Sequence, residues 1–97
     1  MKAQFYILLS QRGRRGFEPY GQYFLGNDGN AANSIFDKLK GNDDLKNEAL
    51  LHFDLMEVVD EIPMKVRMLC CTLEEYAYNC KVITKEIFKH FNLDYKD

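Results

Sequence analysis

Three arginines in a short glycine-containing stretch are the side chains of this sequence with the clearest capacity for chemistry. The stretch QRGRRG, at residues 11–16, contains Arg12, Arg14 and Arg15. Guanidinium groups bind phosphates and carboxylates through paired hydrogen bonds, so a mobile loop of this kind could clamp an anionic ligand. The stretch lacks the G-x-x-x-x-G-K pattern of a phosphate loop, and no helix is expected to begin at Gly16. We therefore favour a solvated loop over residues 11–19 that connects two strands.

His52 and Cys71 are the candidates for nucleophilic chemistry. The strand register that we predict places them opposite each other, and a cysteine beside a histidine can act as an activated nucleophile. The sequence offers no third group to orient the histidine and no oxyanion-hole signature. Cys70 and Cys71 are adjacent in a predicted strand, so they point to opposite faces and cannot readily hold one metal ion. We expect no metal and no cofactor, and the sequence favours a protein that is not an enzyme.

A polar set on one face of the predicted sheet could form the floor of a ligand site. Its members are His52, Asp54, Lys65 and Arg67. Charges that alternate with apolar residues along a strand are more typical of a half-solvated face or of the rim of an interface. We favour the second interpretation.

Composition and charge narrow the class of protein. The 97 residues carry a net charge of −2, which argues against a dedicated nucleic-acid binder. Residues 1–26 alone have a charge of +3 and the remainder −5, so the positive charge is concentrated around the arginines. Three cysteines without an export signal predict free thiols and a cytoplasmic location, and no apolar run is long enough for a membrane span. We expect one domain over 1–97, with 94–97 as a disordered tail.

The first half of the chain predicts two strands and a helix. Residues 4–10 are apolar at both parities, which is typical of a strand covered on both sides and central in its sheet. A second strand is expected at 20–26, entered after Pro19. A short helix should follow within 27–41, with Asn27 or Asp28 as its N-cap and an apolar stripe along one side.

The second half predicts a β-hairpin and a longer helix. In the hairpin at 50–71 we expect a turn over residues 60–63 with Val59 opposite Met64. That register places Met56 opposite Arg67 and His52 opposite Cys71. Thr72 and Glu75 then form a capping box, and an apolar stripe continues for about five turns. The stripe consists of Leu73, Tyr76, Ala77, Cys80, Ile83, Thr84, Ile87, Phe88 and Phe91.

The simplest architecture is an α+β two-layer sandwich of order β-β-α-β-β-α. Its four-stranded, mainly antiparallel sheet would carry both helices on one face. The other face would then present Tyr6, Leu8, His52, Asp54, Met56, Val58, Lys65, Arg67, Leu69 and Cys71. The second strand would add either Tyr23 and Leu25 or Gln22 and Phe24. This surface is more apolar than a monomer usually leaves in water, and a second copy is the simplest cover for it.

Three functions remain open on this basis. The leading hypothesis is a cytoplasmic, non-enzymatic domain that acts as a homodimer or protein-interaction module through the outer sheet face. The alternative is a binder, possibly an enzyme, of a small or phosphate-bearing ligand at the arginine loop, His52 and Arg67. The third is weak binding of single-stranded nucleic acid, with Tyr6, Tyr23 and Phe24 as stacking platforms; the acidic remainder of the chain disfavours it.

Overall fold

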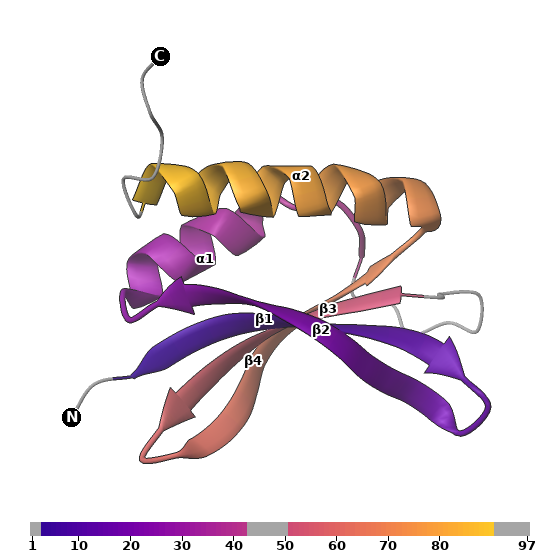
Figure 1. The fold of residues 1–97 in the computed structure, drawn as a ribbon, viewed down its shortest axis with the longest axis horizontal. Helices are drawn as coiled ribbons and strands as arrows, with labels where there is room; N and C mark the ends of the chain where they lie inside the picture. Colours follow the sequence, from indigo (N-terminus) through magenta and orange to yellow (C-terminus); the bar gives the residue numbers. More distant parts are fainter. Residues whose placement is uncertain (1–2, 43–50, 91–97) are drawn as a thin grey trace.

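Four antiparallel strands and two helices make up the fold (Figure 1). The computed structural model describes residues 3–42 and 51–90, so the tail expected at 94–97 and Phe91, the last residue of the predicted stripe, lie outside it. The elements are β1 (Gln4–Gly13), β2 (Gly16–Gly26), α1 (Gly29–Asp37), β3 (Leu51–Val59), β4 (Ile62–Cys71) and α2 (Leu73–His90). The predicted α+β class and the β-β-α-β-β-α order are confirmed.

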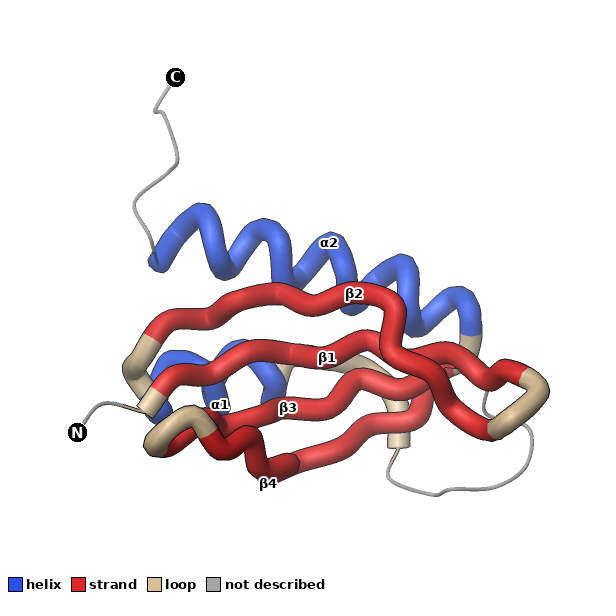
Figure 2. Tube along the Cα trace, turned by 60° about the horizontal axis from the view of Figure 1, so that its bottom comes forward, coloured by secondary structure: helices blue, strands red, loops and turns tan. Residues whose placement is uncertain are grey.

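The sheet has the strand order β2-β1-β3-β4, with every neighbouring pair antiparallel. β1 is therefore an inner strand, as its apolar residues at both parities predict. Both helices lie on the same face of the sheet (Figures 1 and 2). The core between the two layers is built from Phe5, Ile7, Leu9, Leu25, Ala32, Ile35, Phe36, Leu51, Phe53, Leu55, Cys71 and Ile83.

The arginine stretch is the tip of a β-hairpin, and the prediction of a loop over 11–19 was wrong. β1 continues to Gly13 and β2 begins at Gly16, which leaves only Arg14 and Arg15 in the turn. Gly16 has a φ of 106°, a backbone conformation that residues with a Cβ rarely adopt, so a glycine suits this tight turn. Pro19 lies within β2 instead of before it, which the sheet tolerates because β2 is an edge strand.

The hairpin of β3 and β4 has a tighter turn and a bulge that the sequence analysis did not predict. Val59 pairs with Ile62 across a two-residue turn in which Asp60 and Glu61 have φ of 53° and 68°. The positive φ of both residues is typical of the type I′ turn that joins twisted strands. Farther along, Met56 pairs with Lys65 but Leu55 pairs with Arg67, so Val66 is an extra residue in β4. Because side chains alternate along a strand, one extra residue inverts the face of every residue beyond it.

Both helices begin where their capping residues predict. The Asp28 side chain accepts hydrogen bonds from the main-chain N–H groups of Asn30 and Ala31 at the start of α1. At the start of α2, the Thr72 hydroxyl accepts from the Glu75 N–H while the Glu75 carboxylate accepts from the Thr72 N–H. This reciprocal pair is the predicted capping box.

The buried side of α2 is rotated from the predicted stripe. Asn79, Ile83 and Glu86 are buried, whereas Leu73 and Phe88 are exposed. The buried polar residues have partners: Asn79 binds the main chain of Lys40, and the Glu86 carboxylate lies 3.1 Å from Lys38 Nζ. The helix therefore faces the segment that follows α1 as well as the sheet.

Candidate functional site

The outer sheet face, on the side away from the helices, carries an apolar band at one end. Strand pairing aligns Tyr6 with Phe24 and Met56, and Leu8 with Asp54, which in turn pairs with Met68. We define the outer apolar band as Tyr6, Leu8, Phe24, Met56, Val58 and Met68. Phe24 is 49% exposed and the other members are half-buried. Of the two alternatives left open for the second strand, the structure selects Gln22 and Phe24, since Tyr23 pairs with the inward-facing Ile7.

The other end of the same face carries an aromatic and basic group around His52. The Phe17 ring stacks on the His52 ring, with 3.6 Å between the ring centroids, and the Arg12 guanidinium lies 5.5 Å from the centre of the Phe17 ring. His52 is 7% exposed and its Nε2 has no hydrogen-bond partner. Burial lowers the pKa of His52. The positive charges of Lys65 and Arg12 lower this pKa further, whereas the negative charge of Asp54 raises it. Protonation of His52 therefore favours the unfolded chain, so the stability of the folded protein is unaffected by this group above pH 6.5 and declines as the pH falls below that value.

Asp54 lies between the apolar band and the His52 group. Its side chain is flanked across the strands by Leu8 and Met68, which exclude water from it. Its Oδ2 lies 3.7 Å from the half-exposed Lys65 Nζ, and its Oδ1 has no hydrogen-bond partner. Burial raises the pKa of this carboxyl, and the Lys65 charge offsets only part of that effect. The outer face therefore contains a carboxylate that is ionised at a cost to the folded state.

Replacing Asp54 with asparagine should therefore stabilise the protein at neutral pH. Because its pKa is raised in the folded chain, the contribution of Asp54 to stability is complete below its ordinary value of 3.8 and is lost as the pH rises through the raised pKa. Asp54→Asn removes this loss, so we expect the free energy of unfolding to rise by about 1 kcal/mol at pH 7 and to change little near pH 3.5.

Urea unfolding followed by circular dichroism at both pH values measures this effect. Glu18→Gln removes the same charge from an exposed position and is the matched control. If Asp54→Asn lowered the stability at pH 7, the ion pair with Lys65 would outweigh the cost of burying the carboxylate.

The structure separates the arginines that the sequence analysis grouped as ligand candidates. Arg12 lies on the outer face beside Phe17, and Arg14 and Arg15 are exposed at the hairpin tip. Arg67 lies on the helix side of the sheet, because the bulge at Val66 inverts this part of β4. The prediction that Arg67 faces outward with His52 was wrong.

Cys71 and Leu69 are also on the helix side, for the same reason. Leu69 packs against the core and Cys71 is part of it. His52 pairs with Cys70 instead of Cys71, so the predicted pair of His52 and Cys71 does not form. Burial raises the pKa of the Cys71 thiol to about 12, and Glu75 adds to this effect. The thiol therefore stays protonated at neutral pH, which does not suit a nucleophile.

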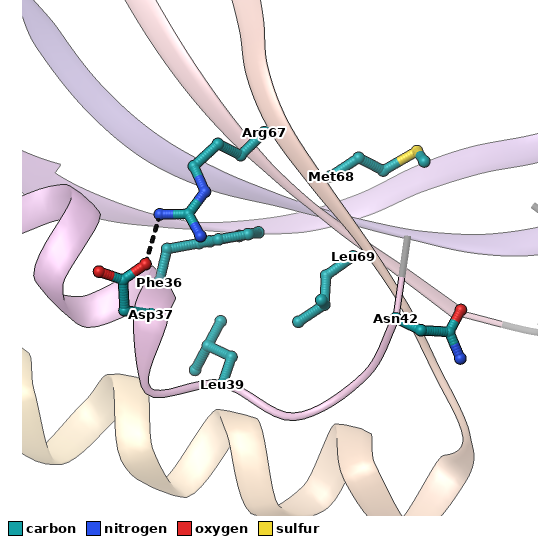
Figure 3. Close-up of a pocket in the computed structure, with 7 residues that line it drawn as sticks. All are labelled: Phe36, Asp37, Leu39, Asn42, Arg67, Met68 and Leu69. Atoms are coloured by element: carbon teal, nitrogen blue, oxygen red, sulfur yellow. Dashed lines mark ion pairs between the residues drawn. The ribbon is translucent and has the colours of Figure 1, made fainter. Parts of the chain in front are cut away.

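A pocket of about 510 Å³ opens beside β4, on the helix side (Figure 3). It is lined by Phe36, Asp37, Leu39, Asn42, Arg67, Met68 and Leu69. The Arg67 guanidinium is its most prominent charged group, and it lies 2.7 Å from the Asp37 carboxylate, 3.2 Å from Asn33 Oδ1 and 4.9 Å from the centre of the Phe36 ring. Arg67 thus ties β4 to α1, and its charge is already matched within the protein.

Two features of the outer face were not predicted. Met68 and Cys70 lie on this face, where Leu69 and Cys71 were expected. In addition, the Phe17 ring covers His52. A bulge has no strong signal in a single sequence, so the exchange in β4 could not be found from it. Phe17 belongs to the stretch predicted as a loop, and its place opposite Arg12 depends on a register shift between Leu9 and Ser10 that has no strong signal in the sequence either.

Known proteins provide no assignment for this surface. Within residues 3–42 and 51–90, no three His, Cys, Asp or Glu side chains are grouped so that they could hold a metal ion. None of the helices in the described ranges has the length and apolar character to cross a membrane. Comparison of the chain with protein-family models, curated proteins and solved structures gave no significant match.

Proposed function

We propose that this chain is a protein-interaction domain that docks onto another protein surface through its outer sheet face. One observation carries the proposal. Both helices lie on one face of the sheet (Figure 2), and no described element covers the other face, which carries the outer apolar band. A contiguous apolar surface bordered by polar residues is typical of protein interfaces. Here the exposed Arg12 and Lys65 lie at the border.

The chemistry of the described residues supports binding more than catalysis. The Cys71 thiol is buried and protonated, and His52 is stacked under Phe17. Arg67 is engaged by Asp37 on the opposite face from His52. None of these groups meets another in the geometry of a nucleophile and its base. Phe24 and Tyr6, in contrast, are aromatic side chains of the kind that anchor protein interfaces.

Site-specific photo-crosslinking tests the proposal. Benzoylphenylalanine at position 24 should give a discrete crosslinked product in the cells that express the protein, whereas the same residue at position 88 should not. Phe88 is the matched control, because it is a similarly exposed phenylalanine on the helix side. A product of any defined mass from position 24 alone would support docking by the outer face. Equal crosslinking from both positions, or none from position 24, would contradict it.

A further inference from the structure

The two ends of the sheet carry opposite charges. The turn between β1 and β2 presents the exposed Arg14 and Arg15, and the turn between β3 and β4 presents the exposed Asp60 and Glu61. β1 and β3 are antiparallel neighbours, so the basic turn lies at one end of the strands and the acidic turn at the other. In Figure 1 both hairpin ends extend away from the helix layer, toward the side of the outer face. Both charged ends can therefore reach a molecule bound on that face.

We propose that the protein docked on the outer face is a second copy of this chain, related by a two-fold axis that runs nearly perpendicular to the strands. This inference rests on the proposed function and names its partner. The axis would lie within the interface, so the strands of the two sheets run in opposite directions. Each basic turn then meets the acidic turn of the facing copy, and the contact forms twice.

The charge pattern distinguishes this arrangement from the other two-fold packing. An axis parallel to the strands would place Arg14 and Arg15 against the same arginines of the facing copy, and Asp60 and Glu61 against their own counterparts. Like charges brought together oppose association, and opposite charges fix the orientation of a complex. A surface that is complementary to itself is the requirement of a two-fold dimer, and the charged turns meet it only when the strands of the two copies run in opposite directions.

The axis would cross the middle of the outer face. Leu8 lies about midway along β1 between the basic and acidic ends, so it would contact its own counterpart close to the axis. Met68 lies at the same level of the sheet as Leu8, whereas Phe24 and Met56 lie nearer the acidic end and would face the His52 end of the facing copy. The basic and acidic turns lie at diagonally opposite corners of the sheet, because they belong to the β1–β2 and β3–β4 hairpins. Two sheets in aligned packing cross their strands by roughly 30°, and a crossing of this size allows each basic turn to reach the acidic turn of the facing copy. The net charge of −2 per chain opposes the association only weakly.

Sedimentation equilibrium of the purified chain, combined with charge reversal, tests the inference. The wild type should show twice the chain mass of 11.4 kDa, with a dissociation constant that increases with salt. The double variant R14E/R15E should weaken the dimer about tenfold or more. Adding Asp60→Asn and Glu61→Lys to it should bring the constant back to within about threefold of the wild type, because opposite charges then face each other again.

The controls separate the possible failures. K81E/K85E makes the same change in net charge on exposed residues of α2 and should leave the dimer unchanged. Circular dichroism checks that each variant is folded, and recovery in the fourfold variant cannot arise from a damaged hairpin. A dimer that is insensitive to R14E/R15E, or equally sensitive to K81E/K85E, would overturn the orientation. A wild-type monomer at 100 µM would exclude the second copy, while a position-24 crosslink to a different protein would leave the proposed function standing.

Discussion

Asn79→Ala should lower the free energy of unfolding by about 3 kcal/mol. Asn79 is fully buried, and its side chain binds both main-chain groups of Lys40: Oδ1 accepts from the N–H at 2.7 Å and Nδ2 donates to the carbonyl at 2.8 Å. Nδ2 also lies 3.3 Å from Cys71 Sγ. Alanine would remove these bonds. The Lys40 N–H would then lose its partner, and the Lys40 carbonyl would keep only the Cys71 thiol, 3.4 Å away. A partly buried backbone group that loses its partner costs about 1–3 kcal/mol.

Chemical unfolding followed by circular dichroism measures this loss. Asn30→Ala is the matched control, because Asn30 is an exposed asparagine in α1, and we expect its effect to stay within about 0.5 kcal/mol. A comparable effect of the two substitutions would show that the hydrogen bonds between Asn79 and Lys40 contribute little to the free energy of unfolding. The prediction matters for the fold because Asn79 fixes the path of the chain between α1 and the edge of β4.

Gly41→Ala should destabilise the protein by about 2–4 kcal/mol. Gly41 has a φ of 150°, and a Cβ at this position would lie 2.5 Å from the Cys70 carbonyl oxygen and 2.9 Å from the Leu69 side chain. The neighbouring Asn42 pairs with Cys70 through two main-chain hydrogen bonds, so the segment cannot move away without breaking them. The substitution therefore combines backbone strain with a steric overlap against a β4 carbonyl.

Thermal and urea unfolding of Gly41→Ala can be compared with those of Gly21→Ala. Gly21 lies in β2, where an added Cβ would meet no atom within 4 Å and φ is not in the strained range. We expect Gly21→Ala to be neutral or slightly stabilising, because alanine restricts the unfolded chain more than glycine does. A mild effect at Gly41 as well would mean that residues 40–42 can shift away from β4.

Local signals in the sequence predicted most of the fold. The capping residue Asp28 and the box of Thr72 and Glu75 fix where the helices begin, since each satisfies backbone N–H groups that no other part of the helix can reach. The apolar residues at both parities of β1 correctly predicted an inner strand. The element order then left few arrangements in which every apolar face could be buried.

The candidate site was predicted only in part, and the errors have identifiable causes. Tyr6, Leu8, His52, Asp54 and Met56 lie on the outer face as expected, because β1 and β3 pair there without interruption. Arg67, Leu69 and Cys71 do not, and the single extra residue Val66 accounts for all three.

The sequence by itself determined the type and order of the helices and strands, the class of fold and the concentration of positive charge near the arginines. Each of these follows from residues that are close together in the chain, through capping, alternation and composition. Only the tertiary structure decided which face Arg67 and Cys71 occupy, that Asn79 is buried as a partner of Lys40, and that the basic and acidic turns lie at opposite ends of one sheet. These features depend on contacts between residues far apart in sequence, where one bulge or one main-chain hydrogen bond outweighs the local pattern.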